Sequence, residues 1–309
     1  MSSPGGKILV IRGGAIGDFI LTLPAIAALR RQFPGAHLEV LGYPHIVQLA
    51  VAGGLVDRVQ SIEARALAGF FARGGDLDPD QADYFSEFDL IVSYLYDPDG
   101  IFRTNVSRCS RAQFIAGPHR PDERAPLHAA KVYLKPLERL AIFEADPVPR
   151  LALGSQRPTH GRVALHPGSG ADKKNWPEIK WAELLQHLLD GTPLNLMLTG
   201  GEAEGERLQR LTAVLPPARV NVAQSLPLPE LARKLQQCAA FIGHDTGISH
   251  LSAALGLPGL VLWGQTTEEI WRPPQKNVVI LKDPRGLKNL SVGQVLLELT
   301  AVLNRNAET

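Results

Sequence analysis

Cysteine is scarce in this sequence, since only Cys109 and Cys238 occur among 309 residues. The two lie far apart, and neither belongs to a CxxC motif or to a spacing typical of metal ligands. We therefore expect neither a framework of structural disulfides nor a zinc site, and the composition fits a reducing compartment. No metal site of any kind is predicted.

The sequence also lacks an excess of either charge and any long apolar run. Lys and Arg number 32 against 31 for Asp and Glu, so the global charge gives no indication of a nucleic-acid partner. The longest apolar stretch, 19–29, contains Thr22 and Pro24 and is too short to cross a bilayer. Residues 1–7 lead directly into an apolar strand, without the hydrophobic core of a signal peptide. We therefore expect a soluble, cytoplasmic protein that binds no nucleic acid.

The length and the order of the apolar segments indicate two α/β domains. A chain of 309 residues is too long for one ordinary core, and two domains of about 150 residues are the natural expectation. Short apolar strands alternate with helical segments in both halves, which is typical of parallel sheets. Proline and glycine without periodicity fill 146–161, so we place the boundary at residue 157 and predict domains of 1–157 and 158–290. The last helix, 291–309, is expected to return and cover the first domain.

A glycine-containing loop, 13–18, follows the first predicted strand, 7–12. It does not match the dinucleotide-binding motif GxGxxG, because Ala15 stands where the motif requires glycine and no acidic residue closes the second strand. The glycines favour a tight turn where another molecule approaches the backbone. Asp18 then lies at the mouth of the sheet, either as part of a site or as a cap of the following helix. Pro24 is expected to kink that helix or to split it in two.

Positive charge gathers in one stretch of the first half. After an acidic run between positions 76 and 99, six Arg or Lys residues occur between 103 and 131, beginning with Arg103 and Arg108. Such a surface suits a phosphorylated or carboxylated ligand. A solvated face is the alternative for each of these side chains.

Four polar loops follow apolar strands in the second half. They are 166–177, 199–204, 245–250 and 264–267. Because the carboxyl ends of parallel strands meet at one edge of a sheet, we expect these loops to converge at the edge where open α/β folds bind ligands. The Walker A motif GxxxxGK[ST] is absent from all four, so a P-loop is excluded.

The third of these loops, 245–250, leads from a strand into a helix. The backbone N–H groups of Thr246 and Gly247 would be unpaired donors at the helix N-terminus, which suits an anion. Asp245 can accept hydrogen bonds from hydroxyls, and His250 follows about one turn later. These features predict a site for a phosphorylated, hydroxyl-rich ligand. In the alternative, Asp245 or Thr246 only caps the helix and His250 is an ordinary core histidine.

Taken together, four segments resemble one known family. They are 12–18 with 23–25, 166–177, 198–204 and 245–256. In their order and spacing the chain is similar, over essentially its whole length, to the ADP-heptose:lipopolysaccharide heptosyltransferases of glycosyltransferase family 9. The resemblance implies an α/β protein of the GT-B fold, with two Rossmann-like domains whose parallel sheets face across a cleft. It also implies an inverting, metal-independent glycosyltransferase that uses no cofactor.

The resemblance assigns donor binding to the second half of the chain. Ser169 and Lys174 would hold the diphosphate, together with the N–H groups at the helix start. Asp245 would accept hydrogen bonds from sugar hydroxyls, and Glu204 would contact the nucleoside. The complete predicted donor site consists of Gly168, Ser169, Lys174, Glu204, Asp245, Thr246, Gly247 and His250.

The same resemblance makes Asp18 the general base that takes the proton from the acceptor hydroxyl. Lys174 completes the predicted catalytic pair, because its charge would stabilise the departing diphosphate. On the acceptor side we predict contacts from Arg12, Gly14, Arg103 and Arg108.

The leading hypothesis is therefore transfer of a heptose or related sugar from an ADP-heptose-type donor to a lipopolysaccharide-core or other lipid-linked saccharide. Two alternatives stay open. One is another nucleotide-sugar enzyme of the same fold, such as an epimerase, and the other is a non-catalytic nucleotide-sugar-binding protein, which would have no need of Asp18. We expect a cytoplasmic monomer, and its lipid-linked acceptor is compatible with peripheral association at the inner membrane.

Overall fold

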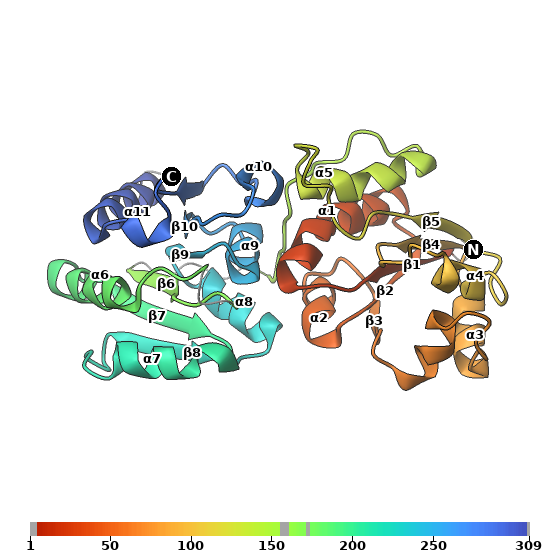
Figure 1. Ribbon diagram of the computed structural model, residues 1–309, viewed down its shortest axis with the longest axis horizontal. Helices are drawn as coiled ribbons and strands as arrows, with labels where there is room; N and C mark the ends of the chain where they lie inside the picture. Colours follow the sequence, from red (N-terminus) through yellow and green to blue (C-terminus); the bar gives the residue numbers. More distant parts are fainter. Residues whose placement is uncertain (1–4, 155–160, 171–173, 308–309) are drawn as a thin grey trace. The chain divides into compact units, whose positions relative to one another are not determined.

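The computed structural model describes residues 5–154, 161–170 and 174–307. The chain divides into two compact units, Met1–Pro147 and Val148–Thr309, and each is built on a parallel sheet (Figure 1). The predicted boundary at residue 157 lies outside the described residues, and the observed division falls earlier. Leu151 already belongs to the second unit, where its N–H donates to the carbonyl of Ala254 at 2.8 Å.

The first unit has a five-stranded sheet in the order β3-β2-β1-β4-β5, in which every neighbouring pair is parallel. Its strands are β1 (Lys7–Arg12), β2 (His37–Gly42), β3 (Arg58–Ser61), β4 (Leu90–Ser93) and β5 (Gln113–Ala116). Its helices are α1 (Ile16–Gln32), α2 (Pro44–Ala52), α3 (Pro79–Ser86), α4 (Ile101–Val106) and α5 (Ala129–Leu134), with the 3-10 helices η1 (Arg65–Phe71) and η2 (Lys135–Leu140). Because the chain order reverses between β1 and β4, the ends of these two strands mark the usual ligand-binding position of such a sheet.

Apolar side chains cover both faces of this sheet. On one face, Leu9, Ile11 and Ile91 pack with the aromatic side chains of η1, α3 and α4. The alternate residues Ile8 and Val10 are equally buried and point to the opposite face. The helix α1 links β1 to β2 on that second face, since right-handed crossovers on the two sides of the order reversal lie on opposite faces.

The helix α1 is a core helix that contains a proline. It runs from Ile16 to Gln32 without interruption, and all but one of its residues from Phe19 to Leu29 are buried. The expected split at Pro24 is therefore wrong, because packing of the helix on the sheet compensates for the hydrogen bond that proline cannot donate. Within the described part of the chain, neither α1 nor any other helix has the length and apolarity needed to cross a bilayer.

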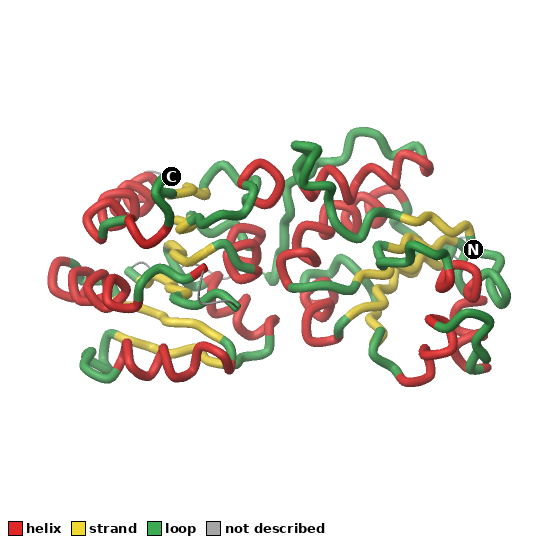
Figure 2. Tube along the Cα trace, viewed as in Figure 1, coloured by secondary structure: helices red, strands yellow, loops and turns green. Residues whose placement is uncertain are grey.

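The second unit has a six-stranded parallel sheet in the order β11-β10-β9-β6-β7-β8. Its strands are β6 (Arg162–His166), β7 (Asn195–Gly200), β8 (Val220–Gln224), β9 (Ala240–His244), β10 (Gly259–Leu262) and β11 (Val278–Leu281). Its helices are α6 (Glu178–Gly191), α7 (Gly205–Thr212), α8 (Leu228–Gln236), α9 (Gly247–Ala254), α10 (Glu268–Trp271) and α11 (Val292–Ala307), with the 3-10 helices η4 (Glu202–Glu204) and η5 (Leu287–Asn289). Figure 2 shows these strands enclosed by the helices of the same unit.

The last helix, α11, packs on the second sheet. Val295 and Leu299 are almost completely buried, in the same apolar cluster as Leu165 and Leu260 of the sheet. The expectation that this helix covers the first domain is therefore wrong. Its apolar face completes the core of the second unit beside α6.

Candidate functional site

Four loops meet at the carboxyl edge of the second sheet. The strands β6 and β9 lie side by side at its centre, with His166 opposite Gly243, and β7 and β10 flank them. The predicted convergence of loops is thus confirmed. The strand order reverses between β6 and β9, which is the position where sheets of this topology bind ligands.

The helix α9 begins at this position without a side-chain cap. Thr246 is the N-cap residue, but its hydroxyl makes no capping hydrogen bond. That hydroxyl is also buried and has no hydrogen-bond partner among the described residues. The N–H groups of Gly247 and Ile248 have no partner within the helix by its geometry. The alternative in which Thr246 only caps the helix is therefore wrong, and the arrangement suits an anion.

Asp245 and Lys174 bring opposite charges to the start of α9. Lys174 Nζ lies 3.9 Å from Asp245 Oδ2, and the side chains are 47% and 12% exposed. Burial raises the pKa of Asp245, while a hydrogen bond with Thr266 and the charge of Lys174 lower it. The structure thus brings these two predicted residues together. Thr266, from the loop after β10, was not predicted, because a single threonine in a polar loop carries no distinguishing signal.

Glu204 connects the loops that follow β6 and β7. Its Oε2 accepts a hydrogen bond from the N–H of Gly201 at 2.8 Å. Its side chain also lies so close to Gly168 that a Cβ there would be 2.1 Å from Glu204 Cγ. The predicted residue Gly168 is therefore required as glycine by its neighbour. Contact of Glu204 with a nucleoside stays a prediction.

Ser169 and His250 are nearly inaccessible, at 4% and 5% exposure. Ser169 follows β6, and His250 lies in the first turn of α9. The structure brings both to the same sheet edge, and both are engaged with neighbouring groups. Contact of either side chain with a ligand stays a prediction.

Two buried histidines end the two central strands. His166 Nδ1 donates to the carbonyl of Thr199 at 2.9 Å, and His244 Nδ1 lies 3.0 Å from the carbonyl oxygen of Gly168. Burial lowers the pKa of both rings, that of His244 to about 3, so both are neutral near pH 7. Neither residue was assigned a role from the sequence. The signal, a histidine at the end of each of two apolar strands, acquires meaning only once the strands are known to be neighbours.

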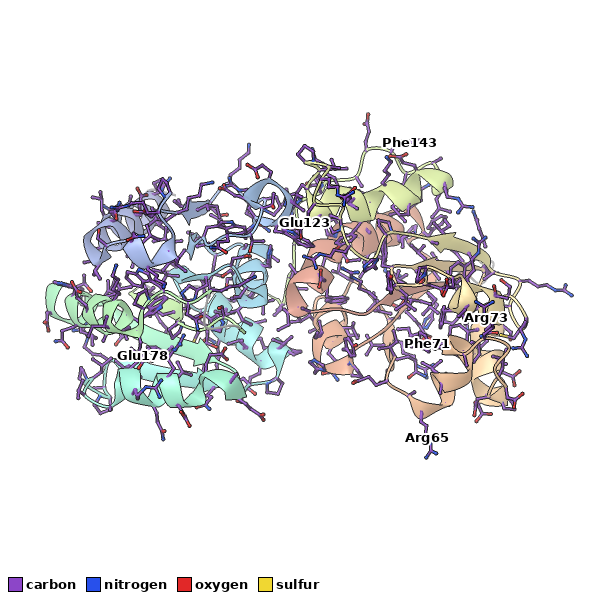
Figure 3. The ribbon with its side chains drawn as sticks, in the orientation of Figure 1. Arg65, Phe71, Arg73, Glu123, Phe143 and Glu178 are labelled. Carbon is purple, nitrogen blue, oxygen red and sulfur yellow. The ribbon has the colours of Figure 1, made fainter. Side chains whose placement is uncertain are left out.

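An ion-pair network between α6 and α7 also holds the loop that follows β6. Arg207 of α7 donates from Nη1 to the carbonyl of Pro167 at 3.0 Å, and its Nε lies 3.5 Å from Glu178 Oε2. Glu178, at the start of α6 and labelled in Figure 3, also accepts two hydrogen bonds from Arg210 at 2.8 and 2.9 Å. The loop is therefore anchored to both adjacent helices.

In the first unit, Asp18 lies in the first turn of α1 at the carboxyl end of β1. Its Oδ2 accepts a hydrogen bond from the N–H of Ala15 at 3.1 Å, and its Oδ1 lies 3.4 Å from Arg12 Nη2. Asp18 thus caps α1, as the alternative proposed. Capping does not explain why the buried Arg12 lies beside the same carboxylate. Gly14 has a φ of +99°, and a Cβ there would be 3.0 Å from Asp18 Oδ2. The turn therefore requires glycine.

Arg12, the last residue of β1, is buried and contacts the turn that contains Gly14 and Asp18. Only 3% of the residue is exposed, and Nη1 donates to the carbonyl of His119 at 2.8 Å. The guanidinium carbon lies 4.5 Å from the ring centroid of Tyr133, which is a cation–π contact. The guanidinium faces the interior and lies beside the Asp18 carboxylate. Contact of Arg12 with an acceptor stays a prediction.

Arg103 and Arg108 make contacts within the first unit. The helix α4, in the connection from β4 to β5, contains Arg103, and Arg108 follows it. The Arg103 guanidinium lies over the ring of Phe114 at 5.8 Å, and Arg108 Nη1 donates to the carbonyl of Gly75 at 2.7 Å. Contact of either side chain with an acceptor stays a prediction.

Two aromatic rings pack against each other beyond the carboxyl ends of β4 and β5. Tyr96 follows β4 and His119 follows β5, and their ring centroids are 4.6 Å apart. Tyr96 is 71% exposed. Arg12 contacts both the backbone carbonyl of His119 and the carboxylate of Asp18.

Within 5–154, 161–170 and 174–307, no group of three or more His, Cys, Asp or Glu side chains has an arrangement that could hold a metal ion. Lys174 and Arg12 bring positive charge to the carboxyl edges of the two sheets. Backbone N–H groups add hydrogen-bond donors there. Metal independence of a reaction stays a prediction.

Comparison with known proteins gives consistent results for sequence and for fold. Residues 142–297 match the family described as glycosyltransferase family 9 (heptosyltransferase). Lipopolysaccharide heptosyltransferase 1 of Escherichia coli O18:K1:H7 (strain RS218 / NMEC) is 33% identical, over 96% of this chain and 94% of the relative.

Solved structures of two Escherichia coli proteins share the fold. The heptosyltransferase WaaC, solved with ADP, superposes with a TM-score of 0.76 at 21% identity, covering 96% of this chain and 99% of that one. The ADP-heptose lipopolysaccharide heptosyltransferase II gives a TM-score of 0.78 at 18% identity, covering 97% and 99%. The two parallel-sheet units thus form a GT-B fold. The chain belongs to glycosyltransferase family 9, the heptosyltransferases, and is a glycosyltransferase.

Proposed function

We propose that this protein transfers a heptose, or a related sugar, from an ADP-linked donor to a lipopolysaccharide-core or other lipid-linked saccharide, with inversion at the anomeric carbon. The name of the 33%-identical relative, lipopolysaccharide heptosyltransferase 1, supports the sugar and the acceptor class. The structure of WaaC with ADP supports an adenosine diphosphate leaving group.

The observation that carries the proposal is the uncapped start of α9 beside the Lys174–Asp245 pair. Negative charge develops on the diphosphate as it departs, and Lys174 with the N–H groups of Gly247 and Ile248 would stabilise it where it develops. Hydrogen bonds to charged groups contribute about 1.5–3 kcal/mol each, so several such contacts amount to a substantial part of a catalytic effect. Asp245 would accept hydrogen bonds from sugar hydroxyls.

Asp18 would act on the acceptor. Its carboxylate takes the proton of the acceptor hydroxyl, the hydroxyl oxygen bonds to the anomeric carbon, and the bond from that carbon to the diphosphate breaks. Attack from the face opposite the leaving group inverts the configuration. The N–H of Ala15 and the guanidinium of Arg12 hold the carboxylate in one orientation for this step.

The step as proposed uses no metal and no cofactor. We further propose that the protein acts as a monomer from the cytoplasm and meets its acceptor at the surface of the inner membrane. The lipid-linked nature of the acceptor in the proposed reaction supports that location.

The first test replaces Asp18 by Asn, which keeps an oxygen acceptor for the N–H of Ala15 and so preserves the turn. Loss of the base is expected to lower kcat by about 10²- to 10⁴-fold while the Kd of ADP stays unchanged. The matched control is Asp83→Asn, on an exposed position of α3. Near-wild-type turnover of Asp18→Asn would refute the base assignment.

The second test addresses the donor. Lys174→Ala is expected to weaken ADP binding by about tenfold or more, and the exposed Lys276→Ala serves as the control. A thermal-shift screen with ADP-, UDP-, GDP- and CMP-linked sugars then identifies the nucleotide. A wild-type protein that binds ADP-heptose but transfers nothing to any lipid-linked saccharide would favour the non-catalytic alternative.

A further inference from the structure

His244 makes two hydrogen bonds with the connection between β6 and α6. It is the last residue of β9 and is 1% exposed. Its Nδ1 lies 3.0 Å from the carbonyl oxygen of Gly168, and its Nε2 accepts a hydrogen bond from the N–H of Trp176 at 2.8 Å. The ring therefore joins two described points of one connection to the neighbouring strand.

These partners determine the protonation state of the ring. A backbone N–H can only donate, so Nε2 carries no proton and accepts from Trp176. The proton therefore resides on Nδ1 and is donated to the carbonyl of Gly168. Both bonds require the neutral ring, and burial, which lowers the pKa of His244 to about 3, keeps it neutral.

We propose that His244 is a positioning residue for donor binding, which holds Gly168 and Trp176 at a fixed distance from the start of α9. This inference rests on the proposed function, because it assumes that the donor diphosphate binds at that helix start. Ser169 is bonded to Gly168 in the chain, and Lys174 precedes Trp176 by two residues. Fixing the two backbone points therefore fixes the attachment points of both predicted diphosphate contacts.

Both residues that His244 binds are also held by other contacts. Trp176 is already anchored by a hydrogen bond from its Nε1 to the carbonyl of Leu290 at 3.1 Å. The side chain of Glu204 packs closely against the Cα of Gly168. The bonds from His244 thus add a precise constraint to groups that the core already retains. The rings of His244 and Trp181 also pack nearly perpendicular to each other, with their centroids 5.5 Å apart.

The experiment compares three variants that change the two bonds separately. His244→Phe keeps a ring but loses both bonds. His244→Asn keeps a donor where Nδ1 lies and loses the acceptor for Trp176. His187→Phe, at an exposed position of α6, is the matched control. For each variant we would measure the hydrogen-exchange rate of the Trp176 amide, the melting temperature, the Kd of ADP, and kcat and KM for the donor.

His244→Phe is expected to raise the exchange rate of the Trp176 amide and the Kd of ADP by about 10- to 100-fold each. His244→Asn is expected to raise the exchange rate equally but the Kd less, because it keeps the bond to Gly168. In both variants the effect on donor KM should exceed that on kcat. If His244→Phe does not fold, His244→Asn carries the test, and His187→Phe should resemble wild type.

Two results would overturn the inference. One is a His244→Asn protein that binds ADP and turns over like wild type although its Trp176 amide exchanges faster. The other is an unchanged exchange rate, which would show that the bond does not constrain the backbone. A wild-type protein that fails to bind ADP would instead refute the proposed function, and the inference about donor binding would fall with it even if the exchange rate confirmed that the bond constrains the backbone.

Discussion

Lowering the pH from 7.5 to 5 is expected to destabilise the second unit by about 2 kcal/mol through His244 alone. Burial lowers the pKa of this ring from 6.5 to about 3, the bond to Gly168 opposes that shift, and electrostatic repulsion from Arg207, and from His166 once it is protonated, adds to it. The unfolded chain therefore binds a proton below pH 6.5 that the folded protein does not bind until about pH 3.

The sign follows from this difference in bound protons. A group that takes up a proton only in the unfolded chain favours unfolding as the pH falls, so stability is complete above pH 6.5 and declines toward pH 3. At pH 5, proton uptake by His244 in the unfolded chain lowers the free energy of unfolding by RT ln(1 + 10^1.5), or about 2 kcal/mol. This loss approaches about 5 kcal/mol below pH 3. The pKa of His166 is also lowered by burial and contributes with the same sign.

The tryptophans provide an assay confined to this unit, because all four of the chain, Trp176, Trp181, Trp263 and Trp271, belong to it. Urea unfolding followed by tryptophan fluorescence at pH 7.5, 6 and 5 gives the free energy of unfolding at each pH. The variant His244→Asn lacks the titrating ring, so it should lose about 2 kcal/mol less than wild type over this range. Comparing the two proteins cancels the contributions of groups that they share. Equal losses in both would refute the reasoning.

Three further substitutions test the supports of the two sites. Gly168→Ala places a Cβ against Glu204 and should cost about 1–3 kcal/mol of stability and weaken ADP binding, as melting and titration would show. Glu204→Gln keeps an acceptor for the N–H of Gly201, so an unchanged melting temperature with a raised Kd for ADP would support the nucleoside contact, and an unchanged Kd would contradict it. Arg12→Lys keeps the charge but loses the planar fork, so kcat should fall while the donor KM stays constant, and an unaltered kcat would show that Asp18 needs no such support.

The sequence allowed the strands, the loops and the edge where they meet to be predicted, because these features depend on local patterns. Apolar runs bounded by glycine and polar residues identify buried parallel strands, and their carboxyl ends must share one edge. The placement of Asp18 beside Gly14 and of Asp245 before α9 required no knowledge of distant contacts.

The sequence is a weaker guide to segments whose position is decided by packing far along the chain. The periodicity of α11 predicts an apolar face but not the domain on which that face packs. The structure shows that it packs with Leu165 and Leu260 of the second sheet.

His244 shows why the supports of a site are harder to predict than the site itself. Its partners, Gly168 and Trp176, precede it by 76 and 68 residues, and both contribute backbone atoms, which leave no signature in a single sequence. A histidine at the end of an apolar strand therefore gives no sign of what it binds until β9 is known to pair with β6. Residues that contact ligand can be recognised by their chemistry, whereas residues that hold them in place are recognised only by geometry. The hydrogen-exchange rate of one amide, that of Trp176, is accordingly a more direct test of His244 than any comparison of sequences.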